Sequence, residues 1–310
     1  MNAPGAIVPT GWAHRRERGA WWLMRLMLFA LRLIGRPVML PIVHFIALYF
    51  FLFGRPAREA SLDYLRRVAI AMPEAGLKPN WRTAYRHFRA FGRSILDKVD
   101  TWSGRLTVKD VEFANYAEMH RLAHADRGCV VLGSHLGNLE ALRALGTLNK
   151  RVKLNVLVHT GHADRFNRAL QLSGATNVEL VQVTQLNPVA AFDLRERIDR
   201  GEWVVITGDR IPVHGGRTVE VSFLGGMAAL PIGPYVLSAL LECSVHLLFV
   251  LRRGSRNHVY FEPFAERIVW QRPTRDAVIA GHAQRYADRL EHYLRLEPLQ
   301  WFNFYPFWRH

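Results

Sequence analysis

The chain has 310 residues, of which 50% are apolar, and its 41 Lys and Arg against 26 Asp and Glu give a formal net charge of +15. This apolar content suffices for a large buried core and excludes intrinsic disorder, and the length fits one sizeable domain plus an accessory segment. The charge favours an acidic partner: nucleic acid, anionic lipid headgroups or an acidic carrier protein. The sequence carries no helix-turn-helix, zinc or RNA-binding signature, which argues against nucleic acid.

The first 54 residues are the first predicted unit, an apolar, helical, membrane-binding segment. Residues 37–54 contain no Asp, Glu, Lys or Arg, and this run approaches the ~20 residues of a spanning helix. Trp21 and Trp22 follow several arginines, a mixture that suits the cytoplasmic headgroup boundary. The late, arginine-containing apolar stretch is not typical of a cleavable signal peptide. A buried core hairpin of a soluble protein is the alternative, and spanning and interfacial placements both stay open.

Residues 55–310 are the second predicted unit, a catalytic domain of the α/β class. After two helical runs, short β-rich runs alternate with helical runs, which predicts a central, mostly parallel sheet flanked by helices. The predicted helices are 61–72, 80–98, 139–148, 164–173, 188–198, 233–242 and 274–295, and the predicted strands are 129–134, 153–159, 178–183, 202–208, 218–223, 245–252 and 259–264.

Cysteine and histidine usage indicates neither a disulfide nor a metal site. Cys129 and Cys243 both lie within apolar runs, where a thiol behaves as a small core side chain, so a reduced domain facing the cytoplasm is expected. His159 and His162 form a short HTGH pattern, but no third ligand follows at a recognisable spacing. We therefore expect no metal and no other cofactor.

The segment GSHLGNLE, residues 133–140, follows a predicted buried strand and opens a predicted helix. Reactive side chains gather at this end of a strand in open α/β sheets. Asn138 can cap the helix, which puts Glu140 in its first turn at the positive end of the helix dipole. A Glu140 carboxylate that accepts the Nδ1 hydrogen of His135 would leave Nε2 free to take a proton from an alcohol. The sequence thus predicts His135 and Glu140 as a catalytic pair for acyl transfer, although such a pair also arises by chance.

Several segments, in order along the chain, resemble the lysophospholipid acyltransferase superfamily and, within it, the bacterial lipid A biosynthesis (lauroyl/myristoyl) acyltransferases. HLGNLE is similar to that family's motif of a His, four residues and an acid. Leu139 stands where the family often has Trp, and the basic tail usual in the family is replaced by aromatic residues. The matching segments are HLGNLE at 135–140, DRFNRAL at 164–170, GEWVVITGDR at 201–210, the block 222–250, and EPLQWFNFYPFW at 297–308.

The resemblance implies an enzyme, an acyltransferase that moves a fatty acyl chain from an acyl thioester to a hydroxyl of a lipid or glycolipid, as in lipid A-type acylation. The implied donor is acyl carrier protein, with coenzyme A left open, and the implied location is the bacterial inner membrane with the catalytic domain facing the cytoplasm. Another lysolipid or specialised lipid is the alternative acceptor, and a membrane-bound lipid-binding protein is the non-enzymatic alternative. Substrate-binding roles are implied for Asn138, Asn167, Asp209 and Arg210.

Three further groups are candidates for the chemistry. Backbone N–H groups at the helix start and the Arg210 guanidinium are expected to stabilise the oxyanion, although Arg210 equally fits a phosphate contact or an ion pair with Asp209. The aromatic residues of 301–308 can line an acyl pocket, rest at a membrane interface or pack in the core. A stripe of basic residues on one helical face fits an acidic carrier protein. That stripe comprises Arg82, Arg86, Arg89 and Arg93.

Overall fold

A computed structural model describes residues 36–102, 111–139, 152–158, 177–182, 188–211 and 216–308 of the chain. Residues 1–35 and several positions singled out in the sequence lie outside these ranges. Those positions are Glu140, His159, His162 and Asn167, together with nearly all of the two helices expected at 139–148 and 164–173.

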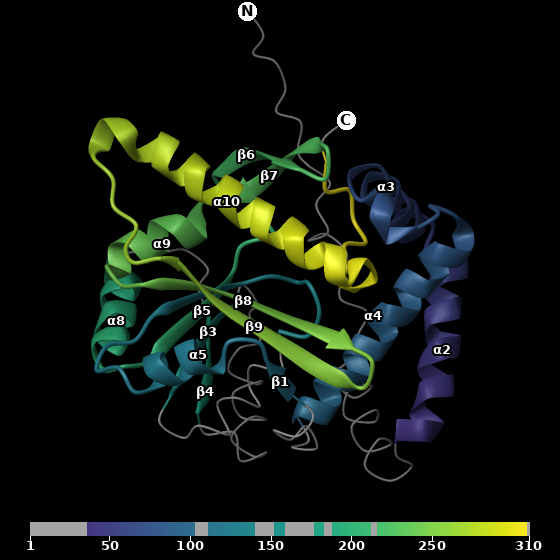
Figure 1. Ribbon diagram of the computed structural model, residues 1–310, viewed down its shortest axis with the longest axis horizontal. Helices are drawn as coiled ribbons and strands as arrows, with labels where there is room; N and C mark the ends of the chain where they lie inside the picture. The colour runs from purple at the N-terminus through teal and green to yellow at the C-terminus, as the bar shows by residue number, and fades with distance from the viewer. Residues whose placement is uncertain are drawn as a thin grey trace, which may run out of the picture.

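A seven-stranded sheet forms the centre of the described structure, with strand order β1-β9-β8-β2-β5-β3-β4 (Figure 1). Every neighbouring pair is parallel except the β8–β9 hairpin. The prediction of a mostly parallel sheet is therefore confirmed. Its strands are β1 (Val111–Phe113), β2 (Val130–Gly133), β3 (Leu154–Val158), β4 (Val178–Gln182), β5 (Trp203–Thr207), β8 (Val245–Arg253) and β9 (Arg256–Ala265).

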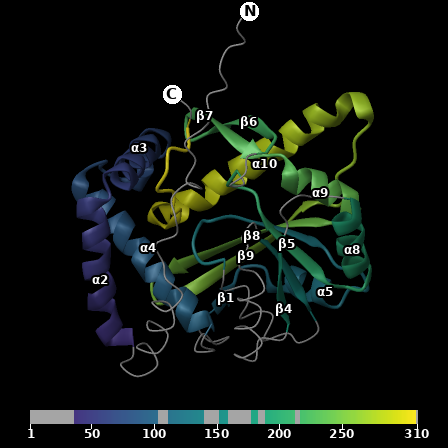
Figure 2. The same ribbon diagram turned by 180° about the vertical axis from the view of Figure 1, so that it is seen from behind.

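Helices flank this sheet, and alternate side chains of its central strands enter two separate cores. Leu132 and Phe249 pack in the core that includes the helices α3, α9 and α10, whereas Val131 and Val250 pack in the core that includes α5. Figure 2 shows the sheet and its flanking helices from behind. The helices of eight or more residues are α2 (Arg36–Phe53), α3 (Arg55–Ala71), α4 (Trp81–Trp102), α5 (Tyr116–Ala123), α8 (Pro188–Asp199), α9 (Gly233–Leu241) and α10 (Arg275–Leu296).

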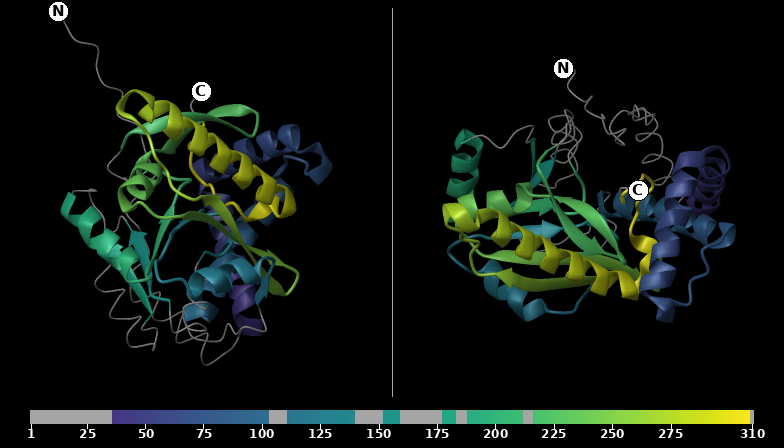
Figure 3. Two further views of the ribbon diagram at one scale, coloured as in Figure 1. Left: turned by 60° about the vertical axis from the view of Figure 1, so that its left-hand side comes forward. Right: turned by 90° about the horizontal axis from the view of Figure 1, so that it is seen from above.

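The first three described helices, α2, α3 and α4, lie together at one side of the molecule (Figures 1 and 3). Within the described ranges no single helix is both long and apolar enough to cross a membrane. Taken together, α2 and α3 satisfy the length and composition criteria, but the pair is bent by 93°. The apolar run of 37–54 is thus one helix that ends at a sharp bend.

Three elements were not anticipated from the sequence. β1 has only three residues and α5 only eight, so neither is long enough to show a clear hydrophobic period. β7 (Gly226–Pro231) pairs antiparallel with β6 (Thr218–Phe223). Its flanking Gly and Pro are typical of a turn, and only the pairing with β6 makes it a strand.

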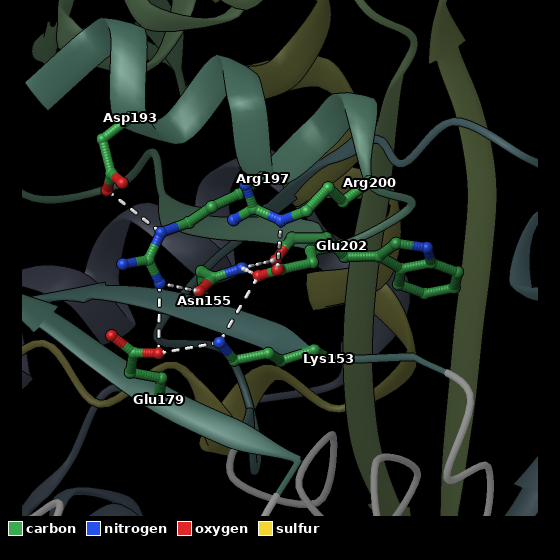
Figure 4. Close-up of polar contacts among 8 residues, drawn as sticks. Lys153, Asn155, Glu179, Asp193, Arg197, Arg200 and Glu202 are labelled. Atoms are coloured by element: carbon green, nitrogen blue, oxygen red, sulfur yellow. Dashed lines mark hydrogen bonds and ion pairs between the residues drawn. The ribbon is translucent and has the colours of Figure 1, made fainter.

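A polar network lies at the amino ends of β3, β4 and β5 and attaches α8 to the sheet (Figure 4). Arg197 of α8 reaches Asn155 Oδ1 at 2.6 Å and Glu179 at 3.1 Å. Asn155 is fully buried and donates to Glu202 at 2.9 Å. Because each polar group of this buried amide has a partner, the network fixes α8 without leaving an unsatisfied group. It is at the end of the sheet opposite the carboxyl ends of β2 and β5.

Candidate functional site

The register of two central strands brings His135 next to Asp209. β2 and β5 are parallel neighbours, and their last residues, Gly133 and Thr207, are paired. His135 and Asp209 each follow two residues after these positions. A hydrogen bond of 3.0 Å from the Gly208 N–H to the Gly133 carbonyl keeps the two chains adjacent beyond the strands. Two segments 74 residues apart therefore meet at the carboxyl edge of the sheet, where α/β folds hold their ligands.

The carboxylate of Asp209 holds both the ring and the backbone of His135. Oδ1 lies 2.8 Å from His135 Nδ1, and Oδ2 accepts the His135 backbone N–H at 2.8 Å. Oδ2 also accepts the indole N–H of Trp301 at 3.0 Å. Asp209 is 0% exposed, whereas the His135 side chain is 34% exposed. The carboxylate thus fixes the imidazole from inside while the ring itself reaches the surface of the site.

The structure gives the Nδ1 atom of His135 a partner that the sequence did not anticipate. The sequence assigned the Nδ1 contact to Glu140, and in the structure Asp209 makes it; Glu140 lies outside the described residues. The sequence also placed Asp209 among substrate-binding residues. Both of its oxygens accept hydrogen bonds from protein groups and the side chain is fully buried. We therefore assign Asp209 a positioning role toward His135.

The protonation states follow from burial and charge. Burial lowers the pKa of His135 below its ordinary value, and the neighbouring Asp209 carboxylate only partly offsets this. Burial alone would raise the pKa of Asp209, but the contacts with His135 and the charge of Arg210 outweigh it and lower that pKa to about 2. At neutral pH the pair is a neutral imidazole held by an ionised carboxylate. With its hydrogen on Nδ1, the ring presents an unprotonated Nε2, as a general base requires.

The loop after His135 is fixed by its own backbone hydrogen bonds. The N–H of Leu136 donates to Ser134 Oγ at 3.2 Å, that of Gly137 to the carbonyl of Gln300 at 2.8 Å, and that of Asn138 to the carbonyl of Val250 at 2.9 Å. Together with the His135 N–H, which Asp209 accepts, these groups are already used. The N–H groups of 135–138 are thus not free to bind an oxyanion, whereas the expected N–H groups at the helix start, from residue 140 onward, lie outside the described residues.

Gly137 makes this loop conformation possible. Its φ of +75° lies in the left-handed region, which residues with a Cβ rarely adopt. A Cβ at this position would also stand 1.9 Å from the Val250 carbonyl oxygen. A residue with a Cβ therefore could not take this place without a shift of the backbone.

Arg210 follows Asp209 and lies beside the C-terminal segment. Its Nη2 donates to the carbonyl of Phe302 at 2.8 Å, and its guanidinium lies 5.8 Å from the ring centre of Tyr305. Its positive charge contributes to the lowered pKa of both His135 and Asp209. The half-buried guanidinium therefore keeps a cation within electrostatic range of His135 while it also anchors the chain end.

Trp301 is a site residue that the sequence placed only within a general aromatic cluster. It is 2% exposed, packs in the main core, and donates to the Asp209 carboxylate. Phe302 and Trp308 are also buried. Of the three interpretations left open for the aromatic cluster, core packing accounts for these residues. The resemblance of the chain end to a conserved family segment was the available signal for Trp301, because no local pattern links it to Asp209.

Asn138 is brought to the site, but its expected capping role concerns a helix outside the described ranges. Its side chain is 2% exposed, and within the described residues neither amide atom has a hydrogen-bond partner. Asn167 lies outside the description. Within the same ranges, no group of three His, Cys, Asp or Glu side chains is placed to hold a metal ion.

A histidine base with a buried carboxylate, at the carboxyl edge of a mostly parallel sheet, defines an enzyme of the group-transfer or hydrolytic type. The chain matches the family model described as bacterial lipid A biosynthesis acyltransferase over residues 10–310. The chain belongs to this family, and it is an acyltransferase that transfers an acyl group to a lipid acceptor. Among curated proteins, none matches the chain.

Proposed function

We propose that the enzyme transfers a fatty acyl chain from an acyl thioester to a hydroxyl group of a lipid or glycolipid, in a lipid A-type acylation. The observation that carries this proposal is the contact of His135 Nδ1 with the buried, ionised Asp209, which leaves Nε2 as the base. Nε2 takes the proton of the acceptor hydroxyl, and the hydroxyl oxygen attacks the carbonyl carbon of the thioester. The C–S bond then breaks, and the imidazolium returns the proton to the departing sulfur.

The oxyanion of this reaction needs a positive or hydrogen-bonding group. Arg210 is the group we assign among the described residues, because the N–H groups of residues 135–138 are used within the protein. The N–H groups at the expected helix start stay a second candidate, since residues from 140 onward lie outside the described ranges. Its guanidinium has five N–H donors, and the structure engages one of them with Phe302. Glu140 stays a prediction of the sequence motif as a second catalytic carboxylate. Asn138 and Asn167 stay proposed substrate contacts.

The direct test uses the full-length protein in detergent with an acyl thioester on acyl carrier protein and lipid acceptors, with products followed by mass spectrometry. We expect an acylated lipid from the native protein and a decrease of roughly 10²–10⁴-fold for His135→Ala. His124→Ala is the matched control, because this exposed histidine precedes β2 in the chain, whereas His135 follows the carboxyl end of that strand. Near-normal turnover by a folded His135→Ala protein would refute the assignment.

The proposed donor is a thioester on acyl carrier protein, a strongly acidic partner. Its proposed docking surface is the basic stripe of α4, where Arg82, Arg86 and Arg93 are exposed. Such a stripe raises encounter rates without specific pairing. Arg82→Glu should raise the KM for the carrier protein and flatten its salt dependence, whereas Arg66→Glu, on α3, should not. Equal use of coenzyme A thioesters by the native enzyme would contradict the donor assignment.

We also propose that the protein is bound to the bacterial inner membrane, with residues 1–54 as the binding segment and 55–310 as the catalytic domain facing the cytoplasm. One face of α2 packs against the protein through Met39, Val43, Ala47 and Phe51. The other face leaves large apolar side chains exposed, a contiguous surface of the kind that binds membranes. They include Phe45 at 69%, Tyr49 at 58% and Phe53 at 74%.

Membrane binding is tested by flotation with vesicles of phosphatidylethanolamine and phosphatidylglycerol. Removal of residues 1–54, and separately Phe45→Ser with Phe53→Ser, should weaken binding. Phe192→Ser is the matched control, because this side chain is 64% exposed on α8, away from α2. Recovery of the native protein in the soluble fraction at low salt, without detergent, would contradict the proposal.

A further inference from the structure

A pocket lies beside the catalytic loop, where α4, the β8–β9 turn and the segment 297–302 meet. Its volume is about 390 Å³. Figure 1 shows the end of the β8–β9 hairpin next to α4. Gly137 and Asn138 form part of its wall, so the pocket begins two residues after His135. The catalytic chemistry described above does not use it.

The charge of this pocket is predominantly positive. Four arginines line it against two carboxylates, and one carboxylate is already paired: Asp97 lies 2.6 Å from Arg252 Nη1. The second, Glu297, is half-buried, and burial raises the pKa of its carboxyl group. Even with both carboxylates ionised, the four arginines leave the pocket with an excess of positive charge. No ion pair to Arg86, Arg89 or Arg93 is formed within the described ranges. The lining arginines are Arg86, Arg89, Arg93 and Arg252.

A buried amide side chain also lines the pocket. Asn138 is 2% exposed, and neither its amide nitrogen nor its amide oxygen has a partner within the described part of the chain. A ligand in the pocket can supply hydrogen bonds to this amide. An oxygen-rich anion accepts from the amide nitrogen and from arginine at the same time.

The pocket wall is held rigidly. Gln300 accepts the backbone N–H of Arg252 at 2.9 Å and donates to the Arg252 carbonyl at 2.6 Å. The Gln300 carbonyl in turn accepts the N–H of Gly137. The same segment that positions the catalytic loop therefore positions the pocket, and a ligand bound there has a fixed relation to His135.

We propose that this pocket binds a phosphate group of a substrate, with Arg86, Arg89 and Asn138 as its contacts. The identity of that substrate depends on the proposed function, whereas phosphate binding at the pocket does not. A phosphate ester occurs in both possible sources, the phosphopantetheine arm of a carrier-bound donor and the headgroup of a phosphorylated lipid acceptor. Either would set the position of a reacting group relative to His135.

Phosphate binding is tested without turnover, on the full-length protein in detergent, by titration with pyrophosphate at constant ionic strength. We expect saturable binding and a higher melting temperature. Arg86→Gln with Arg89→Gln should weaken the Kd about tenfold or more, because each charge-assisted hydrogen bond contributes at least this factor. Arg66→Gln is the control, since it removes one exposed arginine from α3, outside the pocket. Arg86→Lys retains the charge and should retain part of the affinity. This variant replaces the double variant in the test if the double variant does not fold.

Kinetics distinguish the two sources. Arg82→Gln, in the same stripe but outside the pocket, measures the effect of carrier docking alone. If Arg86→Gln raises the KM for the donor clearly more than Arg82→Gln does, the phosphate is that of the phosphopantetheine arm. If it raises the KM for the acceptor, the phosphate is that of the headgroup. An unchanged pyrophosphate Kd in the double variant, or an equal loss in Arg66→Gln, overturns the proposal. If the native protein binds pyrophosphate at this pocket but transfers no acyl group, the proposed function fails while the phosphate site stands.

Discussion

Asp209→Asn replaces a carboxylate by an amide of nearly the same shape, and the structure predicts its effect in detail. The carboxylate meets three groups: His135 Nδ1 at Oδ1, and the His135 backbone N–H and the Trp301 indole N–H at Oδ2. An amide has one oxygen and one NH₂ group. If the oxygen faces Nδ1–H, the NH₂ opposes two buried donors, which costs about 1–3 kcal/mol for each unsatisfied group.

The other amide orientation satisfies all three contacts but changes the tautomer of His135. The oxygen then accepts both N–H donors, and the NH₂ donates to an unprotonated Nδ1. The imidazole hydrogen moves to Nε2, which can no longer act as a base. Because this orientation retains more hydrogen bonds, it should dominate. We expect kcat to fall by roughly 10³–10⁴-fold, the size of loss seen when a serine protease triad is forced into the wrong tautomer.

The assay is steady-state acyl transfer followed by mass spectrometry, with His135→Ala as the reference. Adding Asp209→Asn to His135→Ala should cause no further loss, since the two residues act as a unit. Asp193→Asn, at a side chain 52% exposed on α8, is the matched control and should leave kcat unchanged. A decrease of less than tenfold in a folded Asp209→Asn protein would refute the proposed role of Asp209.

The same variant changes the pH dependence of stability. The pKa of Asp209 is lowered to about 2 in the folded protein. As the pH falls, this carboxylate therefore takes up its proton at a higher pH in the unfolded chain than in the folded protein. The ionised carboxylate therefore contributes about 2 kcal/mol above pH ~4, and this contribution is lost between pH ~4 and ~2. Asp209→Asn should remove this acid-dependent loss in thermal unfolding curves. For activity, the lowered pKa of His135 predicts an acid limb of kcat/KM centred below pH 6.5.

The remaining predictions concern the groups around this pair. Gly137→Ala should destabilise the protein by about 2–4 kcal/mol in thermal unfolding, because it combines a positive φ with a carbonyl clash. Gly225→Ala is the control: Gly225 has a positive φ and open space around it, so its substitution should cost about 1 kcal/mol in the same assay. Trp301→Phe removes one hydrogen bond to the carboxylate and should cost about 1.5–3 kcal/mol, and an unchanged melting temperature would contradict it. Glu140→Gln should reduce acyl transfer and leave in place the acid limb of the kcat/KM profile, which reports the pKa of His135. A shift of that limb would show instead that Glu140 interacts electrostatically with the imidazole.

The sequence by itself determined the class of fold and the position of the base. The alternation of β-rich and helical runs is a local property, so it predicted the mostly parallel sheet and the bounds of six of the seven predicted strands to within one residue. The exception is β9, which begins three residues earlier than predicted. His135 was found because it directly follows a predicted buried strand. Short elements such as β1 escaped prediction, since three residues carry no period.

The partner of His135 was decided only by tertiary structure. Glu140 is five residues away along the chain and was the natural candidate, whereas Asp209 is 74 residues away. The two segments meet because β2 and β5 pair in parallel with Gly133 opposite Thr207. Strand order and register depend on the packing of the whole sheet between its flanking layers, and neither is encoded in any local pattern. For the same reason, only the folded chain brings the Trp301 indole to a carboxylate 92 residues earlier in the sequence.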